Sequence, residues 1–210
     1  MALTKIEISN NALSAIGERA ITDFYPTEST ERARVVTRRY AEIRDSLLRS
    51  HPWNFSTKRV ALSATVTAPA FGFDYAYPLP SDYLRVIGTD DEGYEWQIEA
   101  HTDGSAILVT NRSTVPKIKY IYKNDTPSTY DSLFTQAFVY RLGADLSQHL
   151  TGRPELGKLL MTAFVGLLAE ARSTNASEGT PQKIEADLWL AARQSGITLQ
   201  PFAAGIQEVR

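Results

Sequence analysis

The spacing of apolar residues changes twice along the chain and divides it into three regions. In the first region, apolar residues recur every three or four positions, which is the period of a helix with one buried face. The clearest such stripe consists of Ala33, Val36, Tyr40, Ile43 and Leu47. We therefore expect two helices in this region, over residues 5–16 and 28–50.

The residues at the ends of these two helices support the same boundaries. Thr4 and Glu7 have the spacing of a capping box, in which each side chain accepts a hydrogen bond from the backbone of the other residue. Thr27 is the expected N-cap of the second helix, with Glu28 in its first turn. Pro52 disfavours the helical conformation in the residue before it, so the second helix should end near residue 51.

In the middle region the apolar period becomes two, which is typical of a strand with one buried face. Val60, Leu62, Ala64 and Val66 alternate in this way from residue 58 onwards. The pattern predicts four further strands, at residues 84–87, 94–98, 107–109 and 117–122. We expect the aromatic and proline-rich segment 71–84 to be extended rather than a regular central strand.

A helical period returns in the third region. One apolar face ends at Gly152 and consists of Phe134, Ala137, Phe138, Leu142, Leu146 and Leu150. The next helix should begin at Pro154, with a face made of Leu156, Leu159, Leu160, Ala163, Phe164, Leu167 and Leu168. A shorter helix with Ile184 and Leu188 on one face should follow residues 179–181 and end at Gly196.

This order of elements predicts an α+β fold in which a β-rich module is inserted into a helical bundle. The first and last helices each carry one apolar face, and they bury it most simply against each other. The expected domains are residues 1–57 with 125–196 for the bundle, residues 58–124 for the inserted module, and residues 197–210 for a C-terminal tail.

The turn between the second helix and the first strand is rich in large apolar side chains. It reads His-Pro-Trp-Asn-Phe over residues 51–55. A buried aromatic side chain removes about 150–250 Å² of surface from water, so two of them can fix the orientation of two modules. We therefore expect Pro52, Trp53 and Phe55 to form the seam between the modules, with Trp53 largely buried.

Composition restricts the class of protein further. Apolar residues make up 43% of the chain and charged residues 22%, which is ordinary for a folded protein. The formal net charge of −2 provides no overall positive field to attract nucleic acid or an anionic membrane. We expect neither a signal peptide nor a membrane span, because no apolar run approaches the roughly 20 residues that a span requires.

The sequence contains no recognisable pattern for catalysis or metal binding. There is no cysteine, and the three histidines, His51, His101 and His149, lie in different expected elements. Their spacing is not that of metal ligands, and no phosphate loop or nucleophile motif occurs. We therefore expect no catalytic residue, no cofactor, no metal site and no enzymatic activity.

Four stretches carry a more specific signal. They are ISNNALSAIGERAITDF, RARVVTRRYAEIRDSLLRSHPWNF with the following STKRVAL, DYAYPLPSDYLRV, and FTQAFVYRLGADLSQHLT. Together they resemble the head-to-tail adaptor (connector) proteins of short-tailed phages, the podoviruses, a family known as tail tubular protein A. The resemblance runs from residue 6 to residue 195 in the same order. The HPWNF junction and YPLPSDYLRV are its most specific parts.

The resemblance implies a structural protein of the virion tail, assembled in the host cytoplasm. Members of the family form a ring, usually a dodecamer, beneath the portal protein and join it to the tail nozzle protein. DNA passes through the lumen during ejection without specific binding, and no membrane is involved. A ring repeats one heterologous interface, so each subunit needs two different and complementary faces.

Two other classes of function stay open. A tail-associated polysaccharide or peptidoglycan hydrolase requires paired carboxylates in a cleft, and the available acids are Asp90, Asp91, Glu95 and Glu99. A nonspecific nucleic-acid-binding module requires unpaired arginines on one surface within residues 32–49. We expect ion pairs there instead, because Glu28/Arg32 and Arg38/Glu42 have helical i,i+4 spacing.

The last fourteen positions, residues 197–210, are more apolar than an ordinary disordered tail. Their apolar residues are Ile197, Leu199, Phe202, Ile206 and Val209. One interpretation is that they dock on the helical domain of the same chain. The other is that they are partner-binding residues, which become ordered against the portal or a neighbouring subunit.

Overall fold

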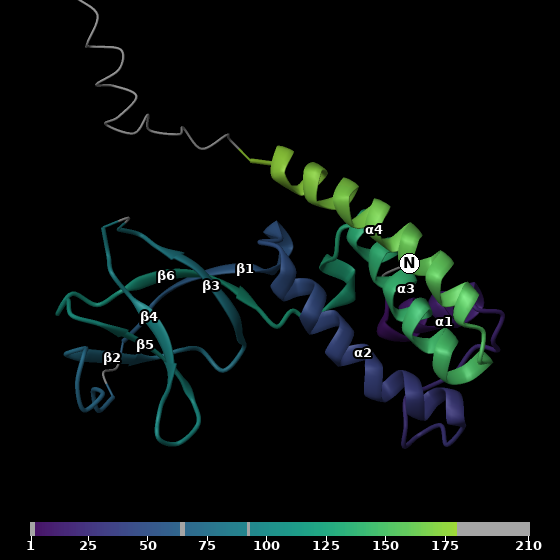
Figure 1. Cartoon of the computed structure of the whole chain (residues 1–210), viewed down its shortest axis with the longest axis horizontal. Coiled ribbons are helices and arrows are strands. Elements are labelled where there is room, and N and C mark those ends of the chain that lie inside the picture. Colours follow the sequence, from purple (N-terminus) through teal and green to yellow (C-terminus); the bar gives the residue numbers. More distant parts are fainter. Residues whose placement is uncertain (1–2, 64–65, 92, 180–210) are drawn as a thin grey trace, which may run out of the picture. The chain divides into compact units, whose positions relative to one another are not determined.

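The computed structural model describes residues 3–63, 66–91 and 93–179, and the chain divides into two compact units, residues 1–176 and 177–210. The elements described below belong to the first unit, except that the last helix ends one residue beyond it. Within the described residues, two helices precede six strands and two further helices follow them (Figure 1). The predicted α+β fold class is therefore confirmed.

The described helices and strands have the following bounds. The helices are α1 (Lys5–Ala15), α2 (Glu31–Ser50), α3 (Ser132–Leu146) and α4 (Pro154–Ser177). The strands are β1 (Thr57–Ala61), β2 (Tyr75–Pro78), β3 (Tyr83–Thr89), β4 (Gln97–Ala100), β5 (Ala106–Thr110) and β6 (Lys117–Tyr122). None of the described helices is both long enough and apolar enough to cross a bilayer.

The start of α1 is as expected, and the start of α2 is not. The capping box of Thr4 and Glu7 is formed, with the Glu7 backbone N–H donating to the Thr4 hydroxyl at 3.2 Å. The N-cap of α2 is Thr30 rather than Thr27, and its hydroxyl accepts a hydrogen bond from the Ala33 backbone at 3.3 Å. The expected cap was wrong because Glu28 holds the preceding loop in a non-helical conformation.

The strands form two antiparallel three-stranded sheets among the described residues, with the orders β1-β6-β3 and β2-β5-β4. Segment 71–84 contains β2, which is not a central strand, as expected. This strand lies at a sheet edge with Pro78 at its end, where a missing N–H disturbs the ladder least. The strand expected from residue 58 to beyond Val66 is broken, because β1 ends at Ala61 and Val66 forms a bridge with Ala76 beside the other sheet.

Buried apolar residues gather mainly in two places. The larger cluster joins α1, α2, α3 and α4, and one strand residue, Ile121, belongs to it. The second combines side chains from both sheets, including Tyr77 and Leu108 from one and Val86 and Tyr120 from the other. The domain ranges expected from the sequence stay a prediction.

The last two helices are packed closely but differ from the expected pattern. A π-helical turn, Ser147–Thr151, follows α3, and Gly152 ends it with a left-handed φ of 60°. A Cβ atom added to Gly157 of α4 would lie 2.6 Å from the Ser147 hydroxyl, so only glycine allows this approach. Of the face expected for α4, Leu160 and Phe164 are buried, whereas Leu159 and Ala163 are exposed and contradict the expectation.

Candidate interaction surfaces

Trp53 lies in the helical core at the end of α2, with an exposed fraction of 0%. Its indole N–H donates a 3.1 Å hydrogen bond to the carbonyl of Leu47, which is in the last turn of the helix. Carbonyls in that turn have no helical partner. The ring also packs edge-on against Phe134 of α3, with 5.0 Å between centroids. Trp53 therefore both caps α2 and fills the space beside α3.

Phe55 and the residue after it connect the two chain segments that join helices to strands. The Phe55 ring stacks on Trp53 with a centroid distance of 5.8 Å, and the Asn124 amide donates to the Phe55 carbonyl at 3.0 Å. The Ser56 hydroxyl donates to the Tyr122 carbonyl at 2.7 Å. The segment entering the strands is thus tied directly to the segment leaving them.

The end of α4 is attached to the same turn through Asn175. Its side-chain oxygen accepts a hydrogen bond from the Asn54 backbone at 2.9 Å, and its backbone carbonyl accepts one from the Asn54 amide at 3.1 Å. The Asn175 amide nitrogen also lies 3.4 Å from the carbonyl of the half-buried Pro52. This contact was not predictable from the sequence, because an asparagine near a helix end carries no periodic signal.

His51, the C-cap residue of α2, lies in a positive environment. Burial lowers the pKa of its imidazole, and the charges of Arg172 and Arg85 lower it further. The neutral ring packs against Trp53 with 4.7 Å between centroids. A neutral imidazole here avoids placing a third positive charge beside the two arginines.

These contacts settle part of what was expected of the junction. The burial of Trp53 and the end of α2 ahead of Pro52 are confirmed. The role of Pro52, Trp53 and Phe55 as a seam that fixes the orientation of two modules stays a prediction.

The acids considered for a hydrolase include two that are paired with basic residues. Asp90 contacts Lys117 at 3.1 Å and Asp91 contacts Arg112 at 2.6 Å. The hydrogen bond from Lys117 is the main cause that lowers the pKa of Asp90, whereas a general acid needs a raised pKa. Within the described residues, no group of three or more histidine, aspartate or glutamate side chains is placed to hold a metal ion.

The expected ion pair between Arg38 and Glu42 does not form. Glu42 instead contacts Arg39 at 2.7 Å, and Arg39 also makes two 2.7 Å hydrogen bonds to Asp145 of α3. Burial alone would raise the pKa of Asp145, yet the hydrogen bonds and charge of Arg39 hold it below its usual range. Arg38 forms no ion pair with any residue that the structure describes.

The expected pair of Glu28 and Arg32 is absent as well. Glu28 precedes the N-cap of α2, so helical spacing does not apply to it. Its carboxylate accepts hydrogen bonds from the Thr30 hydroxyl at 2.6 Å and the Thr22 backbone at 2.6 Å. These hydrogen bonds lower its pKa to about 2. The i,i+4 spacing therefore failed to predict the ion pair, because Glu28 lies in the loop before the helix.

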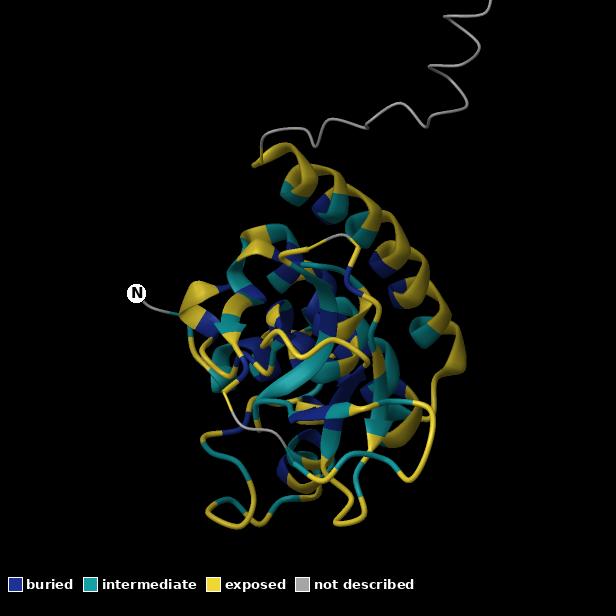
Figure 2. Ribbon diagram, turned by 90° about the vertical axis from the view of Figure 1, so that its left-hand side faces the viewer, coloured by how far each residue is buried: buried dark blue, intermediate teal, exposed yellow. Residues whose placement is uncertain are grey.

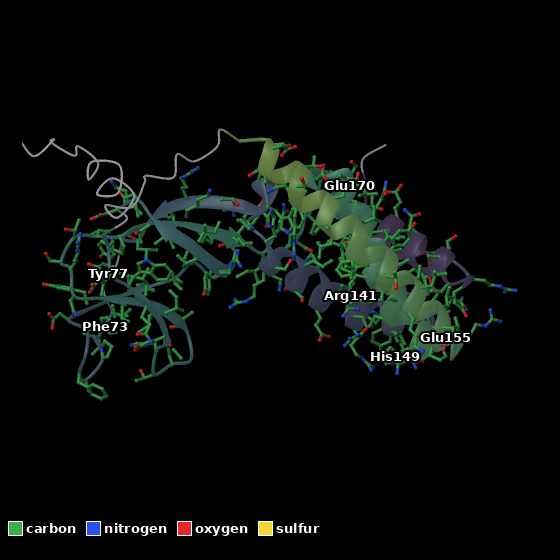
Figure 3. All side chains as sticks on the ribbon, turned by 45° about the horizontal axis from the view of Figure 1, so that its top comes forward. Phe73, Tyr77, Arg141, His149, Glu155 and Glu170 are labelled. Carbon is green, nitrogen blue, oxygen red and sulfur yellow. The ribbon has the colours of Figure 1, made fainter. Side chains whose placement is uncertain are left out.

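Three large apolar side chains of α4 are exposed. Figure 2 shows buried positions along one side of this helix and exposed positions along the other. Leu159, Met161 and Val165 have exposed fractions of 66%, 40% and 57%. Glu155 and Glu170, labelled in Figure 3, lie on either side of residues 159–169, which contain no charged residue.

The remaining predicted partner-binding residues lie outside the described part of the chain. They are Ile197, Leu199, Phe202, Ile206 and Val209. Their docking on the same chain or on a partner stays a prediction.

No protein-family model matches this chain, and no curated protein matches it.

Proposed function

We propose that this protein is a structural head-to-tail adaptor of a short-tailed phage, which forms a ring between portal and tail nozzle and lets DNA pass through its lumen. Its place is in the virion tail, after assembly in the host cytoplasm. Support comes from the four sequence stretches that resemble tail tubular protein A, together with an α+β fold in which the strands lie between two pairs of helices.

The observation that carries the proposal is the exposure of three large apolar side chains on α4. Large apolar side chains that stay exposed on one helix are candidates for burial by a partner. In a ring, each subunit buries one surface against a different surface of its neighbour. Leu159 lies on one flank of α4, and Met161 and Val165 lie on the other, so contacts with neighbours on both flanks would remove them from water.

Beside these side chains, α3 and α4 border a hollow of about 460 Å³. Met161 lines it together with Arg141 of α3 and Lys158 of α4. Asp145 also lines the hollow, and Lys158 is paired with Glu155 at 3.0 Å, so the hollow carries both signs of charge and suits a partner with polar as well as apolar groups.

Substitution of Val165 tests the proposal. Val165→Lys places a charge on the flank of α4 that carries Met161, and Val115→Lys makes the same change at a residue that is 45% exposed between β5 and β6. Both variants should fold with little change in stability, since surface substitutions usually alter it by less than about 0.5 kcal/mol. Sedimentation with purified portal rings should then show attachment of Val115→Lys and of the unchanged protein, but not of Val165→Lys. Equal attachment of all three would refute the assigned surface.

A further inference from the structure

One face of the sheet β1-β6-β3 is basic. Residues directly opposite each other in an antiparallel pair have side chains on the same face. The opposed pairs on this face are Arg59 with Lys119, Ala61 with Lys117, Thr57 with Ile121, Arg85 with Ile121, and Gly88 with Lys119. Arg59, Lys117, Lys119 and Arg85 therefore share what we call the basic sheet face. The other face carries Val60, Ile118 and Tyr120, which belong to the apolar cluster of the two sheets.

This arrangement opposes folding rather than assisting it. Like charges placed directly opposite across two strands are destabilising, and Arg59 lies directly opposite Lys119. Neither of them, nor Arg85, forms an ion pair with a described residue. Lys117 does contact Asp90 at 3.1 Å, but its side chain is 68% exposed, so that pair is weak. The cluster therefore has an uncompensated positive charge.

Protection of sheet edges does not account for the cluster. Natural sheets place basic side chains on edge strands to prevent pairing with other chains. That explanation suits Arg59 on β1 and Arg85 on β3, which are the edge strands here. It does not suit Lys117 and Lys119, because β6 is the central strand and both its edges are already paired.

One end of this face is covered, because Ile121 is fully buried in the helical cluster, whereas the described part of the chain leaves the face open around Gly88. Gly88 lies opposite Lys119 on the β3 side, and a Cβ atom added to Gly88 would meet nothing within 4 Å. Positive charge also extends from Arg85 towards the end of α2. At that end of α2, burial is the largest cause of the lowered pKa of His51, and the charges of Arg172 and Arg85 lower it further.

We propose that the basic sheet face binds the phosphodiester backbone of duplex nucleic acid, with Arg59, Lys119 and Arg85 as the phosphate contacts. The opposed pairs on the face include no aromatic residue, so it has no platform for stacking unpaired bases. Guanidinium and ammonium groups that contact only phosphates do not distinguish one base sequence from another. Duplex nucleic acid is favoured over a single strand because its charge density is higher.

This inference goes beyond the adaptor function, which requires only that DNA passes and assigns no residue to contact it. The net charge of −2 makes the attraction local, since the whole chain would not attract a polyanion. Three phosphate contacts are too few for tight binding, which suits a surface along which DNA moves. The face belongs to one subunit, so its binding can be measured without a ring.

The test is the salt dependence of binding between the full chain and a fluorescent 20-base-pair duplex. Three neutralised phosphates give a slope of about −2.7 for log affinity against log salt, which is a loss of about 40-fold between 50 and 200 mM salt. Lys119→Gln should reduce the slope to about −1.8 and the loss to about 12-fold. Arg153→Gln removes the same charge at an exposed position before α4, and it should leave the slope unchanged. Two duplexes of unrelated sequence should bind equally.

A second variant separates binding from folding. Arg59→Glu places an acid opposite Lys119, so its melting temperature should be no lower than that of the unchanged protein, while its affinity for the duplex at 50 mM salt should fall at least tenfold.

Absence of duplex binding at 50 mM salt would overturn the proposal. So would an unchanged slope for Lys119→Gln, or an equal change for Arg153→Gln, which would indicate diffuse attraction. The assay does not involve the portal. A negative result would therefore overturn the duplex-binding proposal and leave the adaptor proposal unaffected.

Discussion

Replacing Trp53 by alanine removes the side chain that joins the end of α2 to α3. The exposed fraction of Trp53 is 0%, and its ring contacts Phe134 at 5.0 Å and Phe55 at 5.8 Å. Truncation of a buried tryptophan to alanine typically costs about 3–5 kcal/mol. The indole hydrogen bond accounts for only about 1 kcal/mol of this, because the Leu47 carbonyl still accepts a 2.7 Å hydrogen bond from the Ser50 hydroxyl.

Urea unfolding followed by far-UV circular dichroism measures the loss directly. A decrease of about 3–5 kcal/mol corresponds to a melting temperature lower by about 6–20 °C for a chain of this size. Trp53→Phe retains a ring and should lose less. Trp96→Ala is a suitable control, because Trp96 is half-buried in the apolar cluster of the sheets and should cost less than Trp53→Ala. A Trp53→Ala protein that folds and loses less than about 1 kcal/mol would refute this reasoning.

Three further changes have defined outcomes. Arg39→Ala leaves the half-buried Asp145 carboxylate without its two hydrogen bonds and should cost about 1.5–3 kcal/mol, whereas the neighbouring Arg38→Ala removes no ion pair and should be nearly neutral in the same urea titration. The pKa of Glu28 is lowered from 4.5 to about 2, so the stability that its carboxylate contributes is complete above pH 4.5 and is lost as the pH falls towards 2. Glu28→Gln should therefore show a smaller decrease in melting temperature over that range than the unchanged protein, and an identical decrease would contradict the assignment. Asn175→Ala should increase amide hydrogen exchange in the last turn of α4 without affecting α3, and unchanged exchange would show that its hydrogen bonds do not hold the helix end.

Helical period and capping chemistry predicted much of the fold, because both depend on residues that are close in sequence. The stripe from Ala33 to Leu47 is the buried face of α2, and Thr4 caps α1 with Glu7 as expected. The N-cap of α2 was missed because Thr27 and Thr30 both suit that role. The choice between them depends on hydrogen bonds of Glu28 to Thr22, six residues earlier in the chain.

Contacts between distant residues were not predictable in the same way. Asn175 reaches the turn at Asn54 only because the end of α4 lies beside it, and no local pattern encodes that approach. Likewise, the strand pattern shows that Lys119 lies between two apolar residues and that Arg59 precedes the apolar Val60. It does not show that the two face each other, since register is fixed by the folded sheet.

The apolar face of α4 shows a related limit. The sequence indicates a helix with leucines on several sides, but periodicity cannot say which of them meets the core. In the structure Leu160 and Phe164 are buried, and Leu159 is exposed. The surplus of apolar residues on one helix was itself the available signal for a second contact surface.

The adaptor proposal is tested most directly by the native mass of the full chain, measured alone and after mixing with the purified portal protein. The account predicts a new species in which several identical copies of the chain are bound to one portal ring, and its loss in the Val165→Lys variant. Masses of chain and portal that stay separate at every ratio would contradict the proposed function.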